Sequence, residues 1–208
     1  MAADNVAGSR EKLIERGLPI PLSRFNELSA KEAAWREAGG VRGPKIHSLH
    51  AWFARRPPGP SRILTLSAVL PAGADPQQVA AAAGLGGERD KTIYELRPGR
   101  RQVEALVARH LGRRPGDVLV VDPMAGGGSI PLESLRLGFG TVAIDYNPVA
   151  YLVLKATLEF PAKYADSGLF EETLRAAKEL LARAGDELGK YYGADAKNYI
   201  FARGVRCP

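Results

Sequence analysis

A glycine-rich loop between an apolar run and a helix is the feature that most constrains this chain. Residues 122–129 read Asp-Pro-Met-Ala-Gly-Gly-Gly-Ser and follow a short run of apolar and β-branched residues. Glycines there permit positive φ and let a ligand approach the backbone closely, and the helix that follows offers free N–H groups. Ligands of open α/β sheets bind beyond the carboxyl ends of the strands. The segment therefore predicts a cofactor site.

The residues around this loop predict a repeating strand and helix order. Residues 117–122 and 141–145 have the apolar composition of buried parallel strands. Between them, residues 129–137 predict a helix that ends at Gly138, and Pro148 opens another helix that runs to about residue 159. This β-α-β-α order predicts an α/β fold in which helices flank a parallel sheet with right-handed crossovers.

The flanking regions are mainly helical in pattern. We expect further helices at residues 11–16, 30–38 with Ser29 as its cap, 63–70, 76–83, 101–111 and 169–191, and a strand at 198–205. The predicted domains are an N-terminal helical arm, residues 1–43, a His/Trp/Arg block with a helix and linker, residues 44–97, and a cofactor-binding domain, residues 98–208.

Composition places the chain among ordinary globular proteins. Hydrophobic residues make up 45% and charged residues 25% of 208 residues. No apolar run suits a membrane helix, and the polar N-terminus lacks a secretory signal, so a cytoplasmic protein without a membrane partner is expected. The net charge of +6 fits a nucleic-acid partner, or simply a mildly basic protein. Arginine far outnumbers lysine, which is a weak indication of a thermophile.

The loop residues discriminate among cofactors. A phosphate-binding P-loop needs Lys-Ser/Thr after its last glycine, but Ser129 and Ile130 follow here. A dinucleotide fold needs Gly-x-Gly-x-x-Gly, and Pro131 occupies the place of the third glycine. An NAD-type site is therefore a weaker alternative.

S-adenosylmethionine fits the same residues better. Asp122, at the end of the first predicted strand, can face the ammonium group, and Asp145, at the end of the second, can accept both ribose hydroxyls. The two acids are 23 residues apart, from 145 minus 122, which suits one β-α-β unit. Tyr146 can lie against the adenine ring. The alternative is structural: the glycines form only a tight turn and Asp145 caps the helix that Pro148 begins.

These motifs carry a family resemblance. Residues 122–137 resemble motif I of nucleic-acid amino-methyltransferases, and residues 144–150 resemble their acidic second motif. The chain from about residue 18 to 208 resembles archaeal and bacterial adenine-specific DNA methylases that carry a zinc ribbon, a family built around a domain of unknown function. The resemblance implies a Rossmann-like S-adenosylmethionine-dependent methyltransferase fold. The cofactor-binding residues that this interpretation assigns are Asp122, Pro123, Met124, Ala125, Gly126, Gly127, Gly128, Asp145, Tyr146, Asn147, His50, Trp52, Arg55 and Arg56.

The last four of these belong to an aromatic and basic block, residues 47–58. The block resembles the element that closes over the methionine end of the cofactor in many DNA amino-methyltransferases, where an arginine would meet the carboxylate and Trp52 would wall the pocket. Alternatively, it contacts nucleic acid by stacking and phosphate binding, or forms an aromatic hinge in the core. A zinc site at His47 and His50 is not expected, because Cys207 is the only thiol.

The catalytic motif of the resembled family is absent from the sequence. Such enzymes use Asp/Asn/Ser-Pro-Pro-Tyr/Phe to hold the flipped base, and the only Pro-Pro here is Pro57-Pro58, between Arg56 and Gly59. We therefore assign no catalytic residue and no metal ligand. In the family, Cys207-Pro208 resembles the entry to the zinc ribbon. We expect a fragment, a split-gene subunit completed by a second chain or downstream region, or a non-catalytic cofactor binder.

The functional hypotheses follow from these observations. The first is the S-adenosylmethionine-binding domain or subunit of a nucleic-acid methyltransferase (a transferase as the complete protein), with adenine N6 of DNA as the favoured target. The second is a tRNA methyltransferase of the same fold, because the cofactor loop also resembles that of tRNA guanine methyltransferases. The others are a non-catalytic module that binds nucleic acid or a protein partner, and a dinucleotide-dependent oxidoreductase.

Overall fold

The computed structural model describes residues 11–37, 49–53, 55–85, 95–192 and 204. The chain divides into two compact units, residues 1–161 and 162–208. The predicted domain boundaries after residues 43 and 97 both lie within the first unit. His47 and the predicted strand 198–205, except Gly204, lie outside the described residues.

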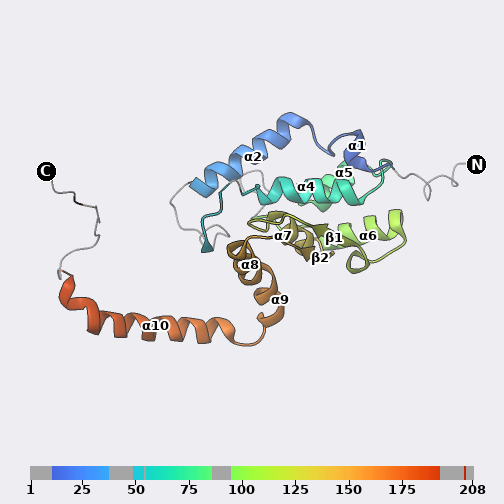
Figure 1. Ribbon diagram of the computed structural model, residues 1–208. Helices are drawn as coiled ribbons and strands as arrows, with labels where there is room; N and C mark the ends of the chain where they lie inside the picture. The colour runs from blue at the N-terminus through green and yellow to red at the C-terminus, as the bar shows by residue number, and fades with distance from the viewer. Residues whose placement is uncertain (1–10, 38–48, 54, 86–94, 193–203, 205–208) are drawn as a thin grey trace, which may run out of the picture. The chain divides into compact units, whose positions relative to one another are not determined.

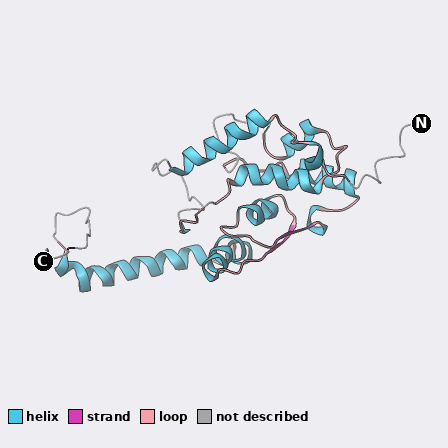
Figure 2. Ribbon diagram, turned by 45° about the horizontal axis from the view of Figure 1, so that its top comes forward, coloured by secondary structure: helices cyan, strands magenta, loops and turns pink. Residues whose placement is uncertain are grey.

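The first unit is mostly helical with a small parallel sheet (Figures 1 and 2). Its elements are α1 (Leu13–Arg16), α2 (Leu22–Glu37), α4 (Pro58–Val69), α5 (Pro76–Ala82), α6 (Arg100–Leu111), β1 (Leu119–Asp122), α7 (Ser129–Arg136), β2 (Gly140–Ala143) and α8 (Pro148–Leu154). A 3-10 turn, Pro115–Asp117, leads into β1, and a π-helical turn, Lys155–Glu159, continues α8 into α9 (Phe160–Tyr164).

Local sequence explains where several helices begin and end. Helix α4 begins at Pro58, and Asp75 caps α5 by accepting a 2.8 Å hydrogen bond from the backbone N–H of Gln77. Proline suits a first helical turn because its missing N–H would have no partner there. Helix α6 ends at Gly112, whose φ of 62° requires a residue that tolerates the left-handed region. The predicted helices at 63–70, 76–83 and 101–111 are confirmed.

The predicted start of the second helix is wrong. Ser29 lies inside α2, which begins at Leu22, and its hydroxyl donates a 2.9 Å hydrogen bond to the carbonyl of Phe25. A serine can cap a helix or bond to the carbonyl four residues earlier, so its presence alone did not locate the N-terminus. Helix α2 packs along α4, and α4 packs on α7 (Figure 1).

Strands β1 and β2 are parallel, with Leu119 opposite Gly140 and Asp122 opposite Ala143, and α7 connects them. The predicted order of strand, helix and strand is therefore confirmed. The prediction that both strands are buried is wrong, because Val120 packs on the core while Leu119 and Val121 are 64% and 51% exposed. In the part of the chain that the structure describes, helix α7 packs on this two-stranded sheet, and Leu119, Val121 and Val142 are exposed.

Two hydrophobic clusters support the first unit. The larger one joins α4, α5 and α6 to the end of α7, and it includes Ile63, Leu66, Val79, Val103 and Val107. A smaller cluster of Ala125, Leu154 and Leu158 packs the glycine-rich loop against α8 and the π-helical turn. Apolar contacts with α8 and the π-helical turn thus hold the loop in place.

The second unit contains α10 (Leu169–Leu188) and a 3-10 turn, Gly189–Tyr191. The predicted helix at 169–191 is confirmed, with its apolar residues Leu174, Leu180 and Leu181 exposed within the described part of the chain. Among the described helices, none is long and apolar enough to cross a membrane.

Candidate cofactor site

The glycine-rich loop lies between the carboxyl end of β1 and the N-terminus of α7, as the sequence predicts. Gly126 and Gly128 have φ of 50° and 80°, a region that glycine adopts without steric cost. The N–H of Ala125 donates to the carbonyl of Ile144, and the N–H of Gly128 donates to the carbonyl of Ala125. The first bond, of 2.9 Å, holds the loop against the residue that follows β2. The second, of 2.8 Å, closes a turn within the loop.

Asp145, just beyond β2, lies directly beside this loop. Its Oδ2 accepts a 2.7 Å hydrogen bond from the backbone N–H of Gly126, and its Oδ1 accepts a 2.8 Å bond from the N–H of Asn147. The N–H groups of Asn147 and Gly126 stabilise the ionised form and hold the pKa of the Asp145 carboxyl below its usual range. A carboxylate has about four acceptor positions, so Asp145 keeps acceptor capacity for a ligand.

The helix-capping role considered for Asp145 belongs to its neighbour instead. The Asn147 side chain accepts a 2.8 Å hydrogen bond from the N–H of Val149 and caps α8. The capping part of the structural alternative is therefore wrong, whereas the glycines do form a tight turn, in which the N–H of Gly128 donates to the carbonyl of Ala125. Asp145 fixes the loop and the cap residue, and both of its bonds are to backbone N–H groups.

The other predicted residues of this edge lie around the two acids. Asp122 is half-buried, and its Oδ1 accepts a 3.2 Å hydrogen bond from the N–H of Met124. Pro123 is exposed, and Met124 and Tyr146 are almost wholly exposed. The two strand ends thus present two carboxylates and two exposed large side chains on one edge of the sheet.

The aromatic and basic block lies against the same loop, although the two are some seventy residues apart. Arg55 is buried, and its Nη1 donates a 2.5 Å hydrogen bond to the carbonyl of Gly127. The Ser129 hydroxyl donates a 2.6 Å bond to the carbonyl of Arg56. One hydrogen bond therefore joins the block to the glycine-rich loop, and another joins it to the first residue of α7.

Glycine at 126 and 127 is required for this approach. A Cβ on Gly127 would lie 2.9 Å from Cζ of Arg55 and 3.1 Å from Cγ of Trp52, and one on Gly126 would lie 3.0 Å from Nε1 of Trp52. Sequence analysis explained these glycines by positive φ, by the approach of a ligand or by a tight turn, and it did not predict the close approach of Trp52 and Arg55.

The described aromatic residues of the block are exposed or half-buried. The rings of His50 and Trp52 are 6.5 Å apart at their centroids, His50 is exposed, and Phe53 is 96% exposed. Trp52 is half-buried. These positions contradict an aromatic hinge packed into the core, because most of the aromatic surface of the block is open.

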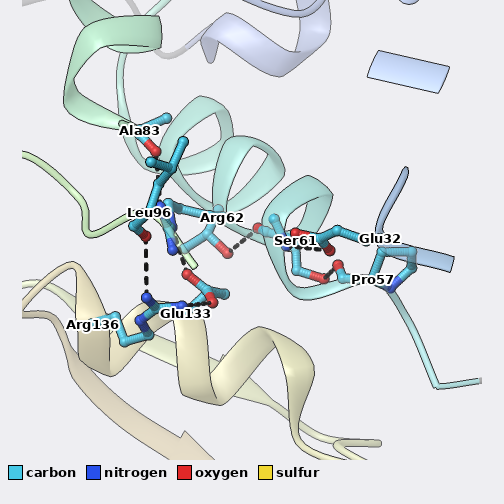
Figure 3. Close-up of polar contacts among 10 residues, drawn as sticks. Glu32, Pro57, Ser61, Arg62, Ala83, Leu96, Glu133 and Arg136 are labelled. Carbon is cyan, nitrogen blue, oxygen red and sulfur yellow. Dashed lines mark hydrogen bonds and ion pairs between the residues drawn. The ribbon is translucent and has the colours of Figure 1, made fainter. Parts of the chain in front are cut away.

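A buried ionic cluster joins α4, which follows the block, to α7, which follows the loop (Figure 3). Glu133 is completely buried; its Oε2 accepts a 2.5 Å hydrogen bond from Nε of Arg62 and its Oε1 a 2.7 Å bond from Nη1 of Arg136. Arg62 also donates to the carbonyl of Ala83, and Arg136 to that of Leu96. Burial lowers the pKa of Arg62, and Glu133 opposes that effect.

Sequence reasoning missed this cluster. Glu133 was one acidic residue in the predicted helix 129–137, and the buried face of that helix also contains the polar residues Ser129 and Ser134. Its partner Arg62 is 71 residues away. The cluster fixes the relative position of the helices that carry the two halves of the candidate site.

Glu32 on α2 adds a further fixed point. Both of its carboxylate oxygens accept from the N–H of Gly59, at 3.1 and 2.9 Å, and the side chain is buried. A carboxylate at the first turn of α4 compensates the free N–H groups and the positive end of the helix dipole. The block is thus followed by a helix that is anchored at both its N-terminus and its middle.

No group of three or more potential metal ligands occurs among the residues that the structure describes. Cys207 and His47 lie outside those residues. Comparison with protein-family models, characterised proteins and solved structures finds no match to this chain. The functional argument therefore rests on the loop, the two acids and the block.

Proposed function

We propose that this chain is the S-adenosylmethionine-binding part of a Rossmann-like nucleic-acid methyltransferase, with adenine N6 of DNA as the favoured target. The observation that carries the proposal is the position of Asp145. Its carboxylate lies 2.7 Å from the N–H of Gly126, at the carboxyl edge of a parallel strand pair. Parallel α/β sheets bind their ligands at this edge.

The chemistry of the edge favours S-adenosylmethionine over a dinucleotide. Residues 122–129 contain three glycines and one carboxylate but no lysine or arginine. Asp122, next to the loop, repels the phosphates of NAD, whereas it can attract the ammonium group of S-adenosylmethionine. Asp145 can accept the ribose hydroxyls of either cofactor. Tyr146, exposed beside Asp145, is placed to cover an adenine ring.

The aromatic and basic block fits the closing element of such a site. Trp52 and Arg55 already contact the glycines of the loop, and α4 leads away from them into the core. Arg55 is engaged with the carbonyl of Gly127 in this conformation. Arg56, whose side chain is exposed, is the residue that we assign to the cofactor carboxylate.

The proposal is tested by calorimetric titration of the chain with S-adenosylmethionine and, separately, with NADH. Asp145→Asn keeps the size of the side chain but removes its charge, so its affinity for S-adenosylmethionine should fall roughly 10- to 100-fold, as expected for lost hydrogen bonds to a charged group. Asp166→Asn, at an exposed position in the second unit, is the matched control and should bind like the wild type.

Two results would contradict the proposal. One is binding of NADH without binding of S-adenosylmethionine, which would assign the loop to a dinucleotide. The other is equal affinity of the wild type and Asp145→Asn for S-adenosylmethionine. Circular dichroism of each variant separates loss of the site from loss of the fold.

A further inference from the structure

A groove of about 920 Å³ lies at the other end of β1 from the glycine-rich loop. Its walls are α6, the residues 113–117 that lead into β1, and the C-terminal end of α7. Because α7 has eight residues, the groove lies roughly 12 Å from the loop, the length of that helix. It is therefore separate from the candidate cofactor site.

Arginines dominate the walls of this groove. Arg100, Arg113, Arg114 and Arg136 line it together with only two acids, Glu104 and Asp117. Residues 100–117 contain five arginines against those two acids, a balance of +3, which is half of the net charge of +6 that the whole chain carries. Of these five arginines, Arg100, Arg113 and Arg114 line the groove.

The guanidinium groups here are available to an anionic ligand. Arg113 forms no ion pair with any residue that the structure describes. Arg114 pairs with Asp117 at 3.1 Å and Arg100 with Glu104 at 3.2 Å, but both arginine side chains are about nine-tenths exposed. The single bond of Arg100 belongs to an exposed pair of the kind that contributes little, so a phosphate can replace its carboxylate at small cost. Arg114 donates to both oxygens of Asp117 through Nε and Nη2 and keeps its other N–H groups for a ligand. Arg136, held by Glu133 and the carbonyl of Leu96, forms the fixed wall.

We propose that this groove binds the phosphodiester backbone of a polynucleotide. Arginine forks match the paired oxygens of a phosphate, and an open groove of this volume accommodates more than one phosphate group. The proposal goes beyond the proposed cofactor site and rests on different residues. It assigns sequence-independent binding to the amino edge of the strands and leaves the carboxyl edge for the cofactor and the target base.

The test is the salt dependence of binding to a labelled duplex, measured by fluorescence anisotropy. Combining Arg113→Ala with Arg114→Ala should weaken binding roughly 10-fold and lower the slope of log affinity against log salt by about 2, since each lost phosphate contact removes about 0.9. Arg113→Lys with Arg114→Lys keeps the charge and should retain most of the slope. S-adenosylmethionine titration of the alanine variant should match the wild type, which separates this proposal from the cofactor proposal.

The matched control is Arg175→Ala with Arg183→Ala on α10, which removes the same charge from another exposed surface. An equal loss of affinity in this control would show that overall basicity drives binding, and would overturn the proposal. An unchanged slope in the groove variant would do the same.

Three probes distinguish the sources of phosphate. Binding of duplex DNA, duplex RNA or both through Arg113 and Arg114 supports a backbone site and identifies the polymer. Displacement of the duplex by millimolar inorganic phosphate at matched ionic strength would instead show a site for small anions and overturn the assignment to a polynucleotide.

Discussion

Two carboxylates of the first unit have opposite environments. Glu133 lies in the interface between α4 and α7, and Asp145 lies beside the glycine-rich loop. Glu133 is completely buried and both of its oxygens accept from arginines. Asp145 is half-buried, and among the described residues it accepts from backbone N–H groups, those of Gly126 and Asn147 above all. Arginines neutralise the charge of Glu133, whereas the charge of Asp145 stays available to a ligand.

The comparison separates residues that hold the site from residues that form it. Complete burial keeps a ligand away from Glu133, and its two guanidinium partners fix α7 against α4. A carboxylate bound only by neutral donors keeps a full negative charge and unused acceptor positions. Changes at the interface should therefore act on stability, and changes at the edge should act on binding.

The largest expected effect is from Glu133→Ala. It leaves the Arg62 guanidinium buried without its counter-ion, which should lower the free energy of unfolding by about 3–5 kcal/mol, the cost of breaking a buried pair on one side. Urea denaturation measures the change. Arg62→Leu combined with Glu133→Leu removes both charges and should lose much less. If the double variant is as unstable as Glu133→Ala, lost packing rather than the unpaired charge causes the decrease in the free energy of unfolding.

The elements around the loop were predictable because their signals are local. An Ala-rich run after Pro76 and the apolar spacing of residues 101–111 predicted α5 and α6, and the 23-residue offset of Asp122 and Asp145 predicted the connection between the strands. These signals depend on backbone geometry over a few residues, which the sequence specifies directly.

The remaining features depend on contacts between distant residues. The apolar runs of β1 and β2 predicted burial on both faces, but only one face is covered in the described part of the chain. The Arg62–Glu133 pair, the contact of Arg55 with Gly127, and the assembly of Arg100, Arg113 and Arg136 into one groove all join different elements. The periodicity of a sequence predicts single helices and strands, but it does not predict which residues of different elements contact one another.

A smaller effect is expected from Gly128→Ala at the edge. The left-handed conformation costs an alanine about 1–2 kcal/mol, and its Cβ would lie 2.9 Å from Cδ2 of Leu154, which adds about 1–3 kcal/mol of overpacking. Gly112→Ala is the control, because Gly112 has a φ of 62° but no atom within 4 Å of a Cβ. Thermal unfolding should place Gly128→Ala below Gly112→Ala in stability; equal stabilities would show that Leu154 moves aside.

The smallest effect concerns pH. The pKa of Asp145 is lowered on folding by the N–H groups of Asn147 and Gly126, so its ionised form stabilises the fold above the unfolded pKa, and this contribution is lost as the pH falls through the folded pKa. The stability difference between the wild type and Asp145→Asn should thus be constant above about pH 5 and shrink below about pH 4. A difference that is independent of pH would show that the hydrogen-bond geometry, not the charge, matters.

The central claim is that the loop edge, and not another surface, receives S-adenosylmethionine. Hydrogen–deuterium exchange with mass spectrometry, with and without saturating S-adenosylmethionine, tests this most directly. The account predicts slower exchange in peptides that cover residues 122–129 and 144–147, with no change at the arginine groove of residues 113–117. Saturation of the protein without protection of the loop peptides, or with protection confined to the groove, would contradict it.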